Sequence, residues 1–433
     1  MNKYHLVLGM EIHFQLKTQN KMFCYCVSSY HESKPNTHVC PTCLGLPGAL
    51  PVANYEAIEK TQKLGLALNC SLSEFSRFDR KHYFYPDLPK GYQISQYEFP
   101  LCIGGFLTLS NGKKCELERI HLEEDTAKSM HKGGQTLIDY NKSGMPLVEV
   151  VTKPIFEKAS EAVEFGKKIQ DIVRLLGIAE VDMEKGQLRL EANISLQTSE
   201  MKEKNILPNY KVEVKNINSF RFLEKAIEYE IKRQTEILES GEKVKQENRG
   251  YNETKGITVS QRSKEEAKDY RYFPEPDIPV MTFSKIHFEE LSKTLPELPD
   301  AIYIRIKEKY NLNETQARFF TSSEGLELLI YFEKFASKLD PVKVANLIIN
   351  KLDFRNLSES DFIEKYNSLE VSEISDEVLE KAVVLVLERE KDAFEKLKNG
   401  KDQVLMFLVG QVMREIKTKI DSKKVIDLIK SKL

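Results

Sequence analysis

Glu11 and His13 stand two positions apart in LVLGMEIHFQL, residues 6–16, a stretch that largely alternates between apolar and polar side chains. Side chains of a β-strand alternate between its two faces, so a strand here would direct Ile12 to one face and Glu11 and His13 to the other. A carboxylate and an imidazole at this spacing can lie on the solvated face of an antiparallel sheet or can bind one metal ion. The stretch alone leaves both interpretations open.

Further carboxylates occur in two other stretches that have strand character. Glu149 lies in GMPLVEVV among apolar residues, and burial of a lone carboxylate is unfavourable unless a cation, a metal ion or a hydrogen-bond donor accompanies it. The run IHLEEDTAK, residues 120–128, supplies an imidazole and three carboxylates: His121, Glu123, Glu124 and Asp125. Pairing of Glu149 with Lys or Arg is one interpretation. A Mg²⁺ site that also includes Glu11, His13 and Glu124 is the other, because Mg²⁺ favours carboxylate ligands and acts beside phosphates.

Four of the seven cysteines form two close pairs, Cys24 with Cys26 and Cys40 with Cys43. Four thiolates joined by a short polar loop can surround a tetrahedral Zn²⁺ ion. All four positions of such an ion would be filled, so we predict a structural zinc site that fixes the loop and has no place for substrate.

Two further patterns indicate a polar binding surface. The run RKHYFYPD, residues 80–87, interleaves basic and aromatic residues, which suits either phosphate binding with base stacking or the edge of an aromatic core. The segments QLRLEANIS and YKVEVKN each alternate apolar residues with charged ones, including Arg189 and Glu191 in the first and Glu213 and Lys215 in the second. Several strands of this type predict a sheet with one apolar face and one densely charged, concave face.

Composition sets limits on the class of protein. The chain has 433 residues, with 64 basic and 66 acidic side chains and a net charge of −2, so no global positive field attracts nucleic acid and any RNA contact must be local. The longest apolar runs are far shorter than a membrane span, no signal peptide is evident, and an odd number of cysteines favours reduced thiols. We therefore expect a cytoplasmic protein with no membrane partner. The sequence contains no P-loop motif.

The pattern of residue types changes along the chain from strand-like to helical. Residues 1 to about 285 contain short β-branched and alternating runs with a few helical stretches, among them 160–178 and 219–241, each with a glycine near its C-terminal end that can end a helix. Prolines punctuate 274–299, and from about residue 301 onward Leu, Ile, Lys and Glu recur at helical spacing. These patterns predict an α+β chain with a sheet-rich N-terminal part and a helical C-terminal part.

In order along the chain, the motifs closely resemble those of the B-subunit family of the bacterial aspartyl/glutamyl-tRNA amidotransferase. They are GMEIH, CPTCLGLPGALPVAN, RKHYFYPDLPKGYQISQ, HLEEDTAK, SGMPLVEVV, LRLEANIS, KNINSF and DYRYFPEPDIP, with FLVGQVM in the tail. The resemblance covers essentially the whole chain. It implies a largely antiparallel-sheet cradle domain at 1–288, an all-α domain at 289–368 and a small tRNA-contacting helical tail domain at 369–433.

The resemblance also implies an activity. In that family the B subunit is part of a carbon–nitrogen-bond-forming ligase that uses ATP and Mg²⁺ to phosphorylate the side-chain carboxylate of Glu on tRNA(Gln) or Asp on tRNA(Asn). Ammonia from a glutamine-hydrolysing amidase, the A subunit, then replaces the phosphate, and the heterotrimer also includes a small C subunit. No glutaminase motif is visible in this chain, and DNA is not an expected partner.

Carried over residue by residue, the family's Mg²⁺ site falls on His13, Glu124 and Glu149 with Glu11 nearby, and its nucleotide or phosphate contacts fall on Lys81 and Tyr83. Arg189 and Arg271 are expected as carboxylate or phosphate clamps. The sequence departs from the family pattern at His82, Glu191 and Gln197, where Asn, Asp and Arg are usual, and in the tail stretch IKTKIDS. The alternative function is a non-catalytic, zinc-stapled scaffold that binds tRNA.

Overall fold

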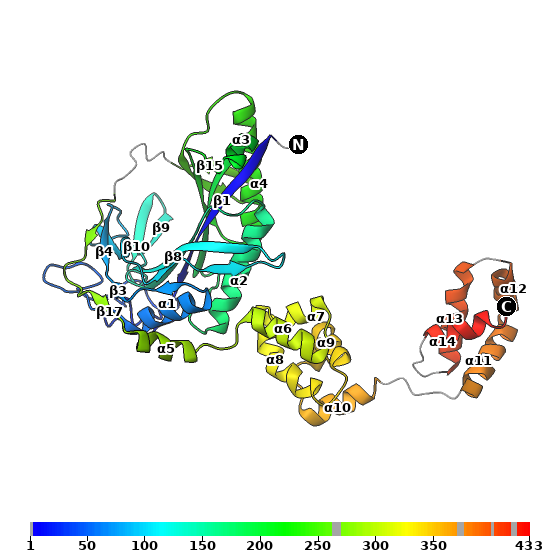
Figure 1. Ribbon diagram of the computed structural model, residues 1–433. Helices are drawn as coiled ribbons and strands as arrows, with labels where there is room; N and C mark the ends of the chain where they lie inside the picture. The colour runs from blue at the N-terminus through cyan, green and yellow to red at the C-terminus, as the bar shows by residue number, and fades with distance from the viewer. Residues whose placement is uncertain (1–2, 262–269, 370–375, 400–401, 417–421) are drawn as a thin grey trace. The chain divides into compact units, whose positions relative to one another are not determined.

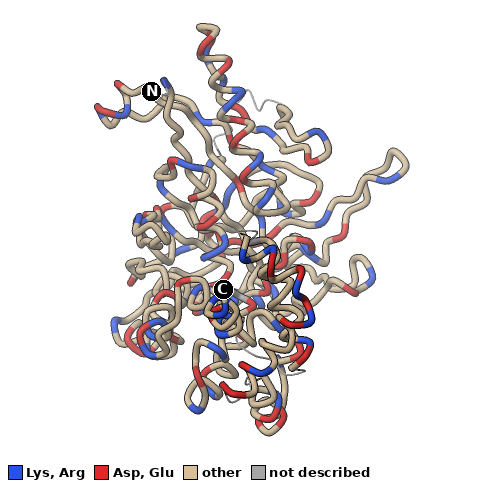
Figure 2. Tube along the Cα trace, turned by 90° about the vertical axis from the view of Figure 1, so that its right-hand side faces the viewer, with Lys and Arg blue, Asp and Glu red and all other residues tan. Residues whose placement is uncertain are grey.

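The computed structural model describes residues 3–261, 270–369, 376–399, 402–416 and 422–433 (Figure 1). The chain divides into two compact units, 1–333 and 334–433. Strands and helices make up the N-terminal part and the C-terminal part is helical, so the predicted α+β class is confirmed. Lys and Arg are interspersed with Asp and Glu along the trace (Figure 2), as the near-neutral charge of the sequence leads one to expect.

A ten-stranded sheet forms the body of the first unit, and its strand β1, Tyr4–Gln15, has neighbours on both sides. On one side follow, outward, β12 (Leu188–Thr198), β13 (Val212–Ile217), β14 (Glu247–Asn252) and β15 (Ile257–Ser260). On the other side follow β11 (Pro146–Thr152), β8 (Lys114–Glu124), β6 (Cys102–Ile103) and β2 (Ser71–Leu72), with β7 (Phe106–Thr108) also beside β8. The β13–β14 pair is parallel and the other pairs are antiparallel.

Three helices, α1 (Tyr55–Ala67), α2 (Ala159–Leu175) and α4 (Phe220–Glu239), supply the partners for the apolar face of the sheet. Leu8 and Ile12 of β1 are fully buried in one core with Phe165 of α2 and Ile227 of α4. The two predicted helices correspond to α2 and α4. Gly177 and Gly241, just beyond their ends, have positive φ values of 64° and 82°, a backbone conformation that glycine adopts readily.

Smaller sheets lie beside the main one. A three-stranded sheet has the order β16 (Phe273–Pro274), β4 (Asp79–His82), β5 (Tyr92–Ser95). There are also two two-stranded sheets. One pairs β9 (Lys128–Lys132) with β10 (Gln135–Asp139), and the other pairs β3 (Phe75–Ser76) with β17 (Met281–Thr282). Contacts between β5 and β8 connect the three-stranded sheet to the main sheet.

The remaining helices have at most 14 residues each. They are α3 (Ser199–Glu203), α5 (Lys285–Lys293), α6 (Pro299–Tyr310), α7 (Glu314–Phe320), α8 (Ser323–Ala336), α9 (Pro341–Asn350), α10 (Glu359–Asn367), α11 (Asp376–Arg389), α12 (Lys391–Lys398), α13 (Leu405–Ile416) and α14 (Ser422–Lys430), together with 3₁₀ turns at Leu352–Phe354 and Asp402–Val404. Aromatic stacking, with ring centroids 3.9 Å apart, joins Phe335 to Phe362. Helices α11 to α14 share a separate apolar core.

Among the helices of the described residues, none combines the length and the apolar character that a bilayer crossing requires. The predicted domain boundaries at 288/289 and 368/369 remain predictions, and most of the divergent tail stretch, residues 417–421, lies outside the described residues.

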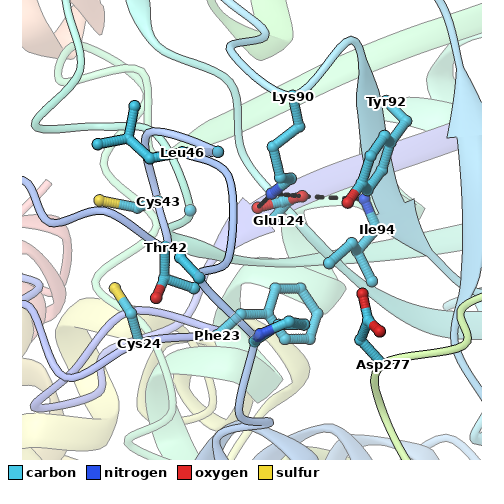
Figure 3. Close-up of a pocket in the computed structure, with 14 residues that line it drawn as sticks. Phe23, Cys24, Thr42, Cys43, Leu46, Lys90, Tyr92, Ile94, Glu124 and Asp277 are labelled. Carbon is cyan, nitrogen blue, oxygen red and sulfur yellow. Dashed lines mark hydrogen bonds and ion pairs between the residues drawn. The ribbon is translucent and has the colours of Figure 1, made fainter.

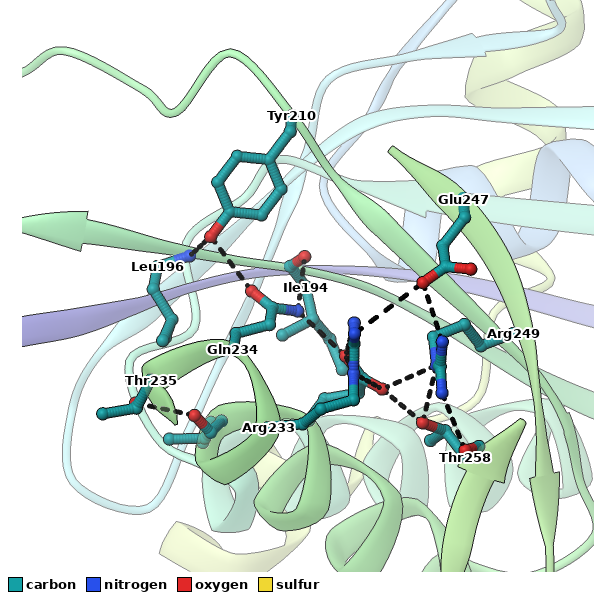
Figure 4. Close-up of polar contacts among 11 residues, drawn as sticks. Ile194, Leu196, Tyr210, Arg233, Gln234, Thr235, Glu247, Arg249 and Thr258 are labelled. Atoms are coloured by element: carbon teal, nitrogen blue, oxygen red, sulfur yellow. Dashed lines mark hydrogen bonds and ion pairs between the residues drawn. The ribbon is translucent and has the colours of Figure 1, made fainter. Parts of the chain in front are cut away.

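A buried polar network fixes α4 against the edge of the sheet (Figure 4). The Glu230 carboxylate is fully buried and accepts hydrogen bonds from Arg233 (2.8 Å) and Gln234 (3.1 Å) of its own helix. It also accepts the hydroxyl of Thr258 on β15 and forms an ion pair of 3.1 Å with Arg249 on β14. Glu247 of β14 also pairs with both guanidinium groups, at 2.7 Å from Arg249 and 3.7 Å from Arg233. Glu230 is the carboxylate that α4 itself contributes to this network, so the position of α4 depends on it.

Replacing Glu230 by Ala should therefore lower the free energy of unfolding by about 3 kcal/mol, the lower end of the usual cost of removing one partner from a buried ion pair, because Glu247 still pairs with both arginines. Urea unfolding of the full chain measures this. Glu236→Ala is the matched control on the same helix, because its ion pair with Lys232 spans 4.0 Å on the surface and should contribute less than about 1 kcal/mol. Equal losses for the two variants would contradict the assigned role of Glu230.

Candidate active site on the polar face of the sheet

The face of the sheet opposite α2 and α4 gathers charged side chains from adjacent strands. Strand register places His13 of β1 across from Glu149 of β11 and, on its other side, from Arg189 of β12. Glu149 in turn lies across from His121 of β8. Because residues directly opposite in neighbouring strands project from the same face, these side chains meet above the sheet.

The first cluster consists of His13, His121, Glu123 and Glu149. The Nε2 atoms of His13 and His121 lie 3.4 Å and 3.0 Å from Oε2 of Glu149. Glu123 Oε2 is 3.8 Å from His121 Nε2 and accepts a hydrogen bond of 3.1 Å from Ser95 of β5. Donor atoms of His13, Glu123 and Glu149 all lie within 4.8 Å of one another, which is close enough for one ion to contact all three.

Opposite charges set the protonation of this cluster. Burial lowers the pKa of His13, but the neighbouring carboxylates, Glu149 foremost and then Glu191 and Glu123, together outweigh burial and raise the pKa to about 9. Burial raises the pKa of Glu149, but His121 and His13 outweigh it and hold that pKa well below its usual range. The pKa of Glu123 is also lowered, against burial, mainly by its hydrogen bond with His121. Both carboxylates are therefore ionised at neutral pH.

The donor set fits a divalent cation. Two ionised carboxylates and one imidazole suit Mg²⁺ or Mn²⁺. Within the described residues, the Nδ1 atoms of His13 and His121 are buried and have no hydrogen-bond partner. Protonated imidazole carries part of the positive charge that balances the two carboxylates, and a metal ion can replace that proton.

Glu124, predicted as a metal ligand, lies elsewhere. Successive strand residues project to opposite faces, so the face that directs Glu123 toward Glu149 directs Glu124 away from it. The Glu124 carboxylate accepts hydrogen bonds from Lys90 Nζ (2.6 Å) and from the backbone N–H of Ile94 (2.9 Å), as Figure 3 shows. The pair lines a cavity of about 130 Å³ together with Phe23 and Cys43. Glu123 therefore takes the place predicted for Glu124.

Glu11, two residues before His13 on the same face of β1, belongs to a second cluster. Its donor atoms and those of Glu191 and Glu213 lie within 4.8 Å of one another. Lys215 Nζ neutralises two of these groups, at 3.0 Å from Glu191 and 2.7 Å from Glu213. Burial raises the pKa of Glu191, but His13 and Lys215 outweigh burial and lower it to about 2. Asn193 donates a hydrogen bond of 2.9 Å to Glu11.

Lys81 and Tyr83, on and just after β4, lie beside the first cluster. Burial lowers the pKa of Lys81, but Glu123, Tyr272 and Glu149 outweigh burial and raise it above its usual range. The ammonium group lies 4.9 Å from the ring centroid of Tyr270. Burial raises the pKa of Tyr83, whose hydroxyl donates a hydrogen bond of 3.3 Å to Gln93. Lys81 is thus a permanent cation next to an anionic cluster.

The two predicted arginine clamps differ in their surroundings. Arg189 donates a hydrogen bond of 3.0 Å to Asp125, which also accepts Gln15 (2.8 Å) and pairs with Lys142 at 2.8 Å. Arg271 has a left-handed backbone (φ 42°), and its carbonyl oxygen lies 3.1 Å from Nδ1 of His82. Arg189, whose side chain is 42% exposed, and Lys142 thus place two cations around the buried carboxylate of Asp125 at the edge of the polar face.

The four predicted cysteines come together. Donor sulfur atoms of Cys24, Cys26, Cys40 and Cys43 lie within 4.8 Å of one another, an arrangement that is compatible with a zinc ion. A hydrogen bond from the Cys24 thiol, and secondarily the ammonium group of buried Lys21, lower the pKa of Cys43 to about 5 although burial opposes this. Lys21 Nζ lies 3.8 Å from the sulfur of Cys43.

Sequence reasoning did not assign a role to His121, Glu123 or Lys90. The alternation of side chains along a strand places His121 and Glu123 on one face and Glu124 on the other. This pattern identifies Glu123 only once the pairing of β8 with β11, which sets His121 opposite Glu149, is known. Lys90 lies outside the regular strands, and no sequence pattern indicates its contact with Glu124.

The described geometry can be compared with known proteins. A family model for the GatB/GatE catalytic domain matches residues 6–289, and a model described as GatB domain matches residues 343–433. The B subunit of the aspartyl/glutamyl-tRNA(Asn/Gln) amidotransferase of Thermodesulfovibrio yellowstonii is 41% identical over an alignment that covers 99% of this chain and 98% of the relative. The proteins of the same name from Thermotoga neapolitana and Carboxydothermus hydrogenoformans are 42% and 39% identical, covering 96% and 100% of this chain and 96% and 99% of the relatives.

The match of the catalytic-domain model spans every strand of the polar face, and the relatives align along nearly their whole length. The chain therefore belongs to the B-subunit family of the aspartyl/glutamyl-tRNA(Asn/Gln) amidotransferase.

Proposed function

We propose that this chain is the subunit of a tRNA-dependent amidotransferase that activates the side-chain carboxylate of Glu on tRNA(Gln), of Asp on tRNA(Asn), or of both. ATP is the phosphoryl donor, and the product is Gln-tRNA(Gln) or Asn-tRNA(Asn). The observation that carries the proposal is the convergence of His13, Glu123 and Glu149 beside Lys81 on one face of the sheet. The names of the relatives support the same reaction.

The chemistry explains why this arrangement is needed. Ammonia does not displace an oxygen from a free carboxylate, because that oxygen is a poor leaving group. Attack of a carboxylate oxygen on the γ-phosphorus of ATP forms an acyl phosphate and releases ADP, and attack of ammonia on the acyl carbon then releases phosphate and leaves the amide. Phosphoryl transfer of this kind relies on positioning and on neutralisation of negative charge.

The residues divide this work. His13, Glu123 and Glu149 would hold Mg²⁺, which when bound neutralises phosphate oxygens during transfer. Lys81 contributes a positive charge that stays in place because Glu123 and Glu149 stabilise its protonated form. Tyr83 and Arg189 are proposed as further contacts for nucleotide or phosphate, and Arg271 as a clamp from the segment beside β4.

The ammonia has to come from a partner, because the described residues offer no arrangement that we can assign to glutamine hydrolysis. We propose that an amidase, the A subunit, and a small C subunit form a heterotrimer with this chain. The competing idea of a non-catalytic scaffold is not favoured, since a surface that only binds an anionic RNA has no use for two converging groups of carboxylates.

Substitution of the proposed metal ligands should show that Glu123, and not the adjacent Glu124, contributes to metal binding. Glu123→Gln and Glu149→Gln, each in the complex with its partners, should reduce ATP hydrolysis that depends on Glu-tRNA(Gln) or Asp-tRNA(Asn) by roughly 10²- to 10³-fold, because each removes a charge that holds the cation. Both should also weaken Mn²⁺ binding, measured by electron paramagnetic resonance.

Glu116→Gln serves as the control on the same strand, because Glu116 pairs on the surface with Lys153 at 2.6 Å and should have no effect on either measurement. Mn²⁺ binding should also be unchanged in Glu124→Gln. Weaker Mn²⁺ binding in Glu124→Gln but not in Glu123→Gln would refute the assignment of the ligands.

We also propose that the cysteine cluster, Cys24, Cys26, Cys40 and Cys43, holds a structural zinc ion. Elemental analysis of the purified chain should find about one zinc per chain, and Cys43→Ser should lose most of it. Cys70→Ala, at a buried cysteine outside the cluster, should keep the metal. Full retention of zinc by Cys43→Ser would exclude the site. Chelation should also lower the thermal midpoint, because the ion fixes the loop that contains residues 24–43.

A further inference from the structure

The three-stranded sheet and the segments that flank it carry a row of tyrosine rings, Tyr97, Tyr272, Tyr270 and Tyr83. The rings of Tyr97 and Tyr272 are nearly parallel, at an angle of 13°, and their centroids are 4.4 Å apart. Tyr270 follows at 6.3 Å from Tyr272, and Tyr83 at 6.1 Å from Tyr270, both in edge-on contacts. The row therefore presents one flat pair at the Tyr97 end.

The Tyr97 end of the row is open to solvent. Tyr97 is 57% exposed, whereas Tyr272 behind it is partly buried. Two other aromatic rings of the same small sheet already have a partner on one face: Arg80 lies 4.3 Å from the ring centroid of Tyr92, and His82 stacks on Phe273 at 5.0 Å, although Phe273 is still 43% exposed. An exposed ring with a second ring stacked behind it has one free face on which a planar ligand can stack.

The backbone at Tyr97 is held in place. Its N–H donates a hydrogen bond of 3.0 Å to the buried carboxylate of Asp79, which also accepts Arg77 at 3.1 Å. Ring stacking on Tyr272 orients the side chain from the other side. The ring of Tyr97 is therefore pre-positioned, so a ligand that stacks on it does not have to order it first.

The row also adjoins the proposed phosphorylation site. Ser95, the last residue of β5, lies two residues before Tyr97, and its hydroxyl donates a hydrogen bond to Glu123. Lys81 lies over Tyr270 at 4.9 Å. Tyr270 in turn contacts Tyr272, with ring centroids 6.3 Å apart, so the row runs from the cation of Lys81 to the stacked pair.

We infer that Tyr97, supported by Tyr272, is a stacking platform for an adenine base. The inference rests on the proposed function, in which two substrates carry adenine close to the reacting groups. One is ATP. The other is the 3′-terminal adenosine of the tRNA, whose ribose carries the aminoacyl ester and so lies a few bonds from the carboxylate that reacts. Stacking on tyrosine is a common way to hold a base without reading its hydrogen-bonding edge.

Fluorescence of 2-aminopurine, which is quenched when the base stacks, tests this directly as equilibrium binding. One arm uses 2-aminopurine riboside triphosphate, and the other uses a tRNA with 2-aminopurine as its 3′-terminal base, each titrated with the full chain in complex with its partner subunits. The chain contains no tryptophan, so it contributes no indole emission. Tyr97→Ala should weaken binding of one probe by about 5-fold to about 150-fold and reduce its quenching, and the affected arm identifies the source of the adenine.

Two variants control for other effects. Tyr97→Phe keeps the ring and should bind both probes as the wild type does. Tyr55→Ala removes a tyrosine of matching exposure, 55%, at the start of α1 and should change nothing. Unchanged affinity and quenching of both probes in Tyr97→Ala, or no quenching of either probe by the wild type, would overturn the inference. Failure of the proposed function is a separate result: the wild-type complex would then bind the probes but show no tRNA-dependent hydrolysis of ATP.

Discussion

Neutralisation of the Glu149 carboxylate is the interaction on which the site depends. Glu149 lies in the middle of an apolar strand, and a buried carboxylate without a partner is strongly unfavourable. The structure supplies an imidazole from each neighbouring strand, His13 from β1 and His121 from β8. This requirement fixes which residues of three strands must be in register. The position of Glu123, on the same face as His121, then follows, whereas Lys81 comes from β4 of the neighbouring three-stranded sheet.

Charge balance extends across the whole polar face. The first cluster contains two carboxylates beside Lys81, and the second contains three carboxylates beside Lys215. At the edge of the face, Asp125 has the opposite excess, with Arg189 and Lys142 around it. The surface therefore alternates anionic and cationic regions over a few strands, an arrangement suited to a substrate pair in which phosphates, a metal ion and a carboxylate must lie side by side.

Local patterns in the sequence were sufficient to predict features that depend on residues close to one another in the chain. The alternation in β1, the helical spacing in α2 and α4, and the clustering of Cys24, Cys26, Cys40 and Cys43 are of this kind. The composition of the first cluster was harder to predict, because Glu123 and Glu124 are adjacent and both acidic. The choice between them depends on the pairing of β8 with β11, which brings residues of distant segments together. The contact of Lys90 with Glu124 depends on loop conformation, for which the sequence has no periodic signal.

Strand β1 joins the hydrophobic core and both charged clusters through a single alternating pattern. Leu8 and Ile12 face the helices, while Glu11 and His13 serve one cluster each on the opposite face. Insertion or deletion of one residue before Glu11 would exchange the two faces of the strand and drive ionisable groups into the core. The length of this segment is consequently under two constraints at once, and natural variation in the family should enter β1 as substitutions and leave its residue count unchanged.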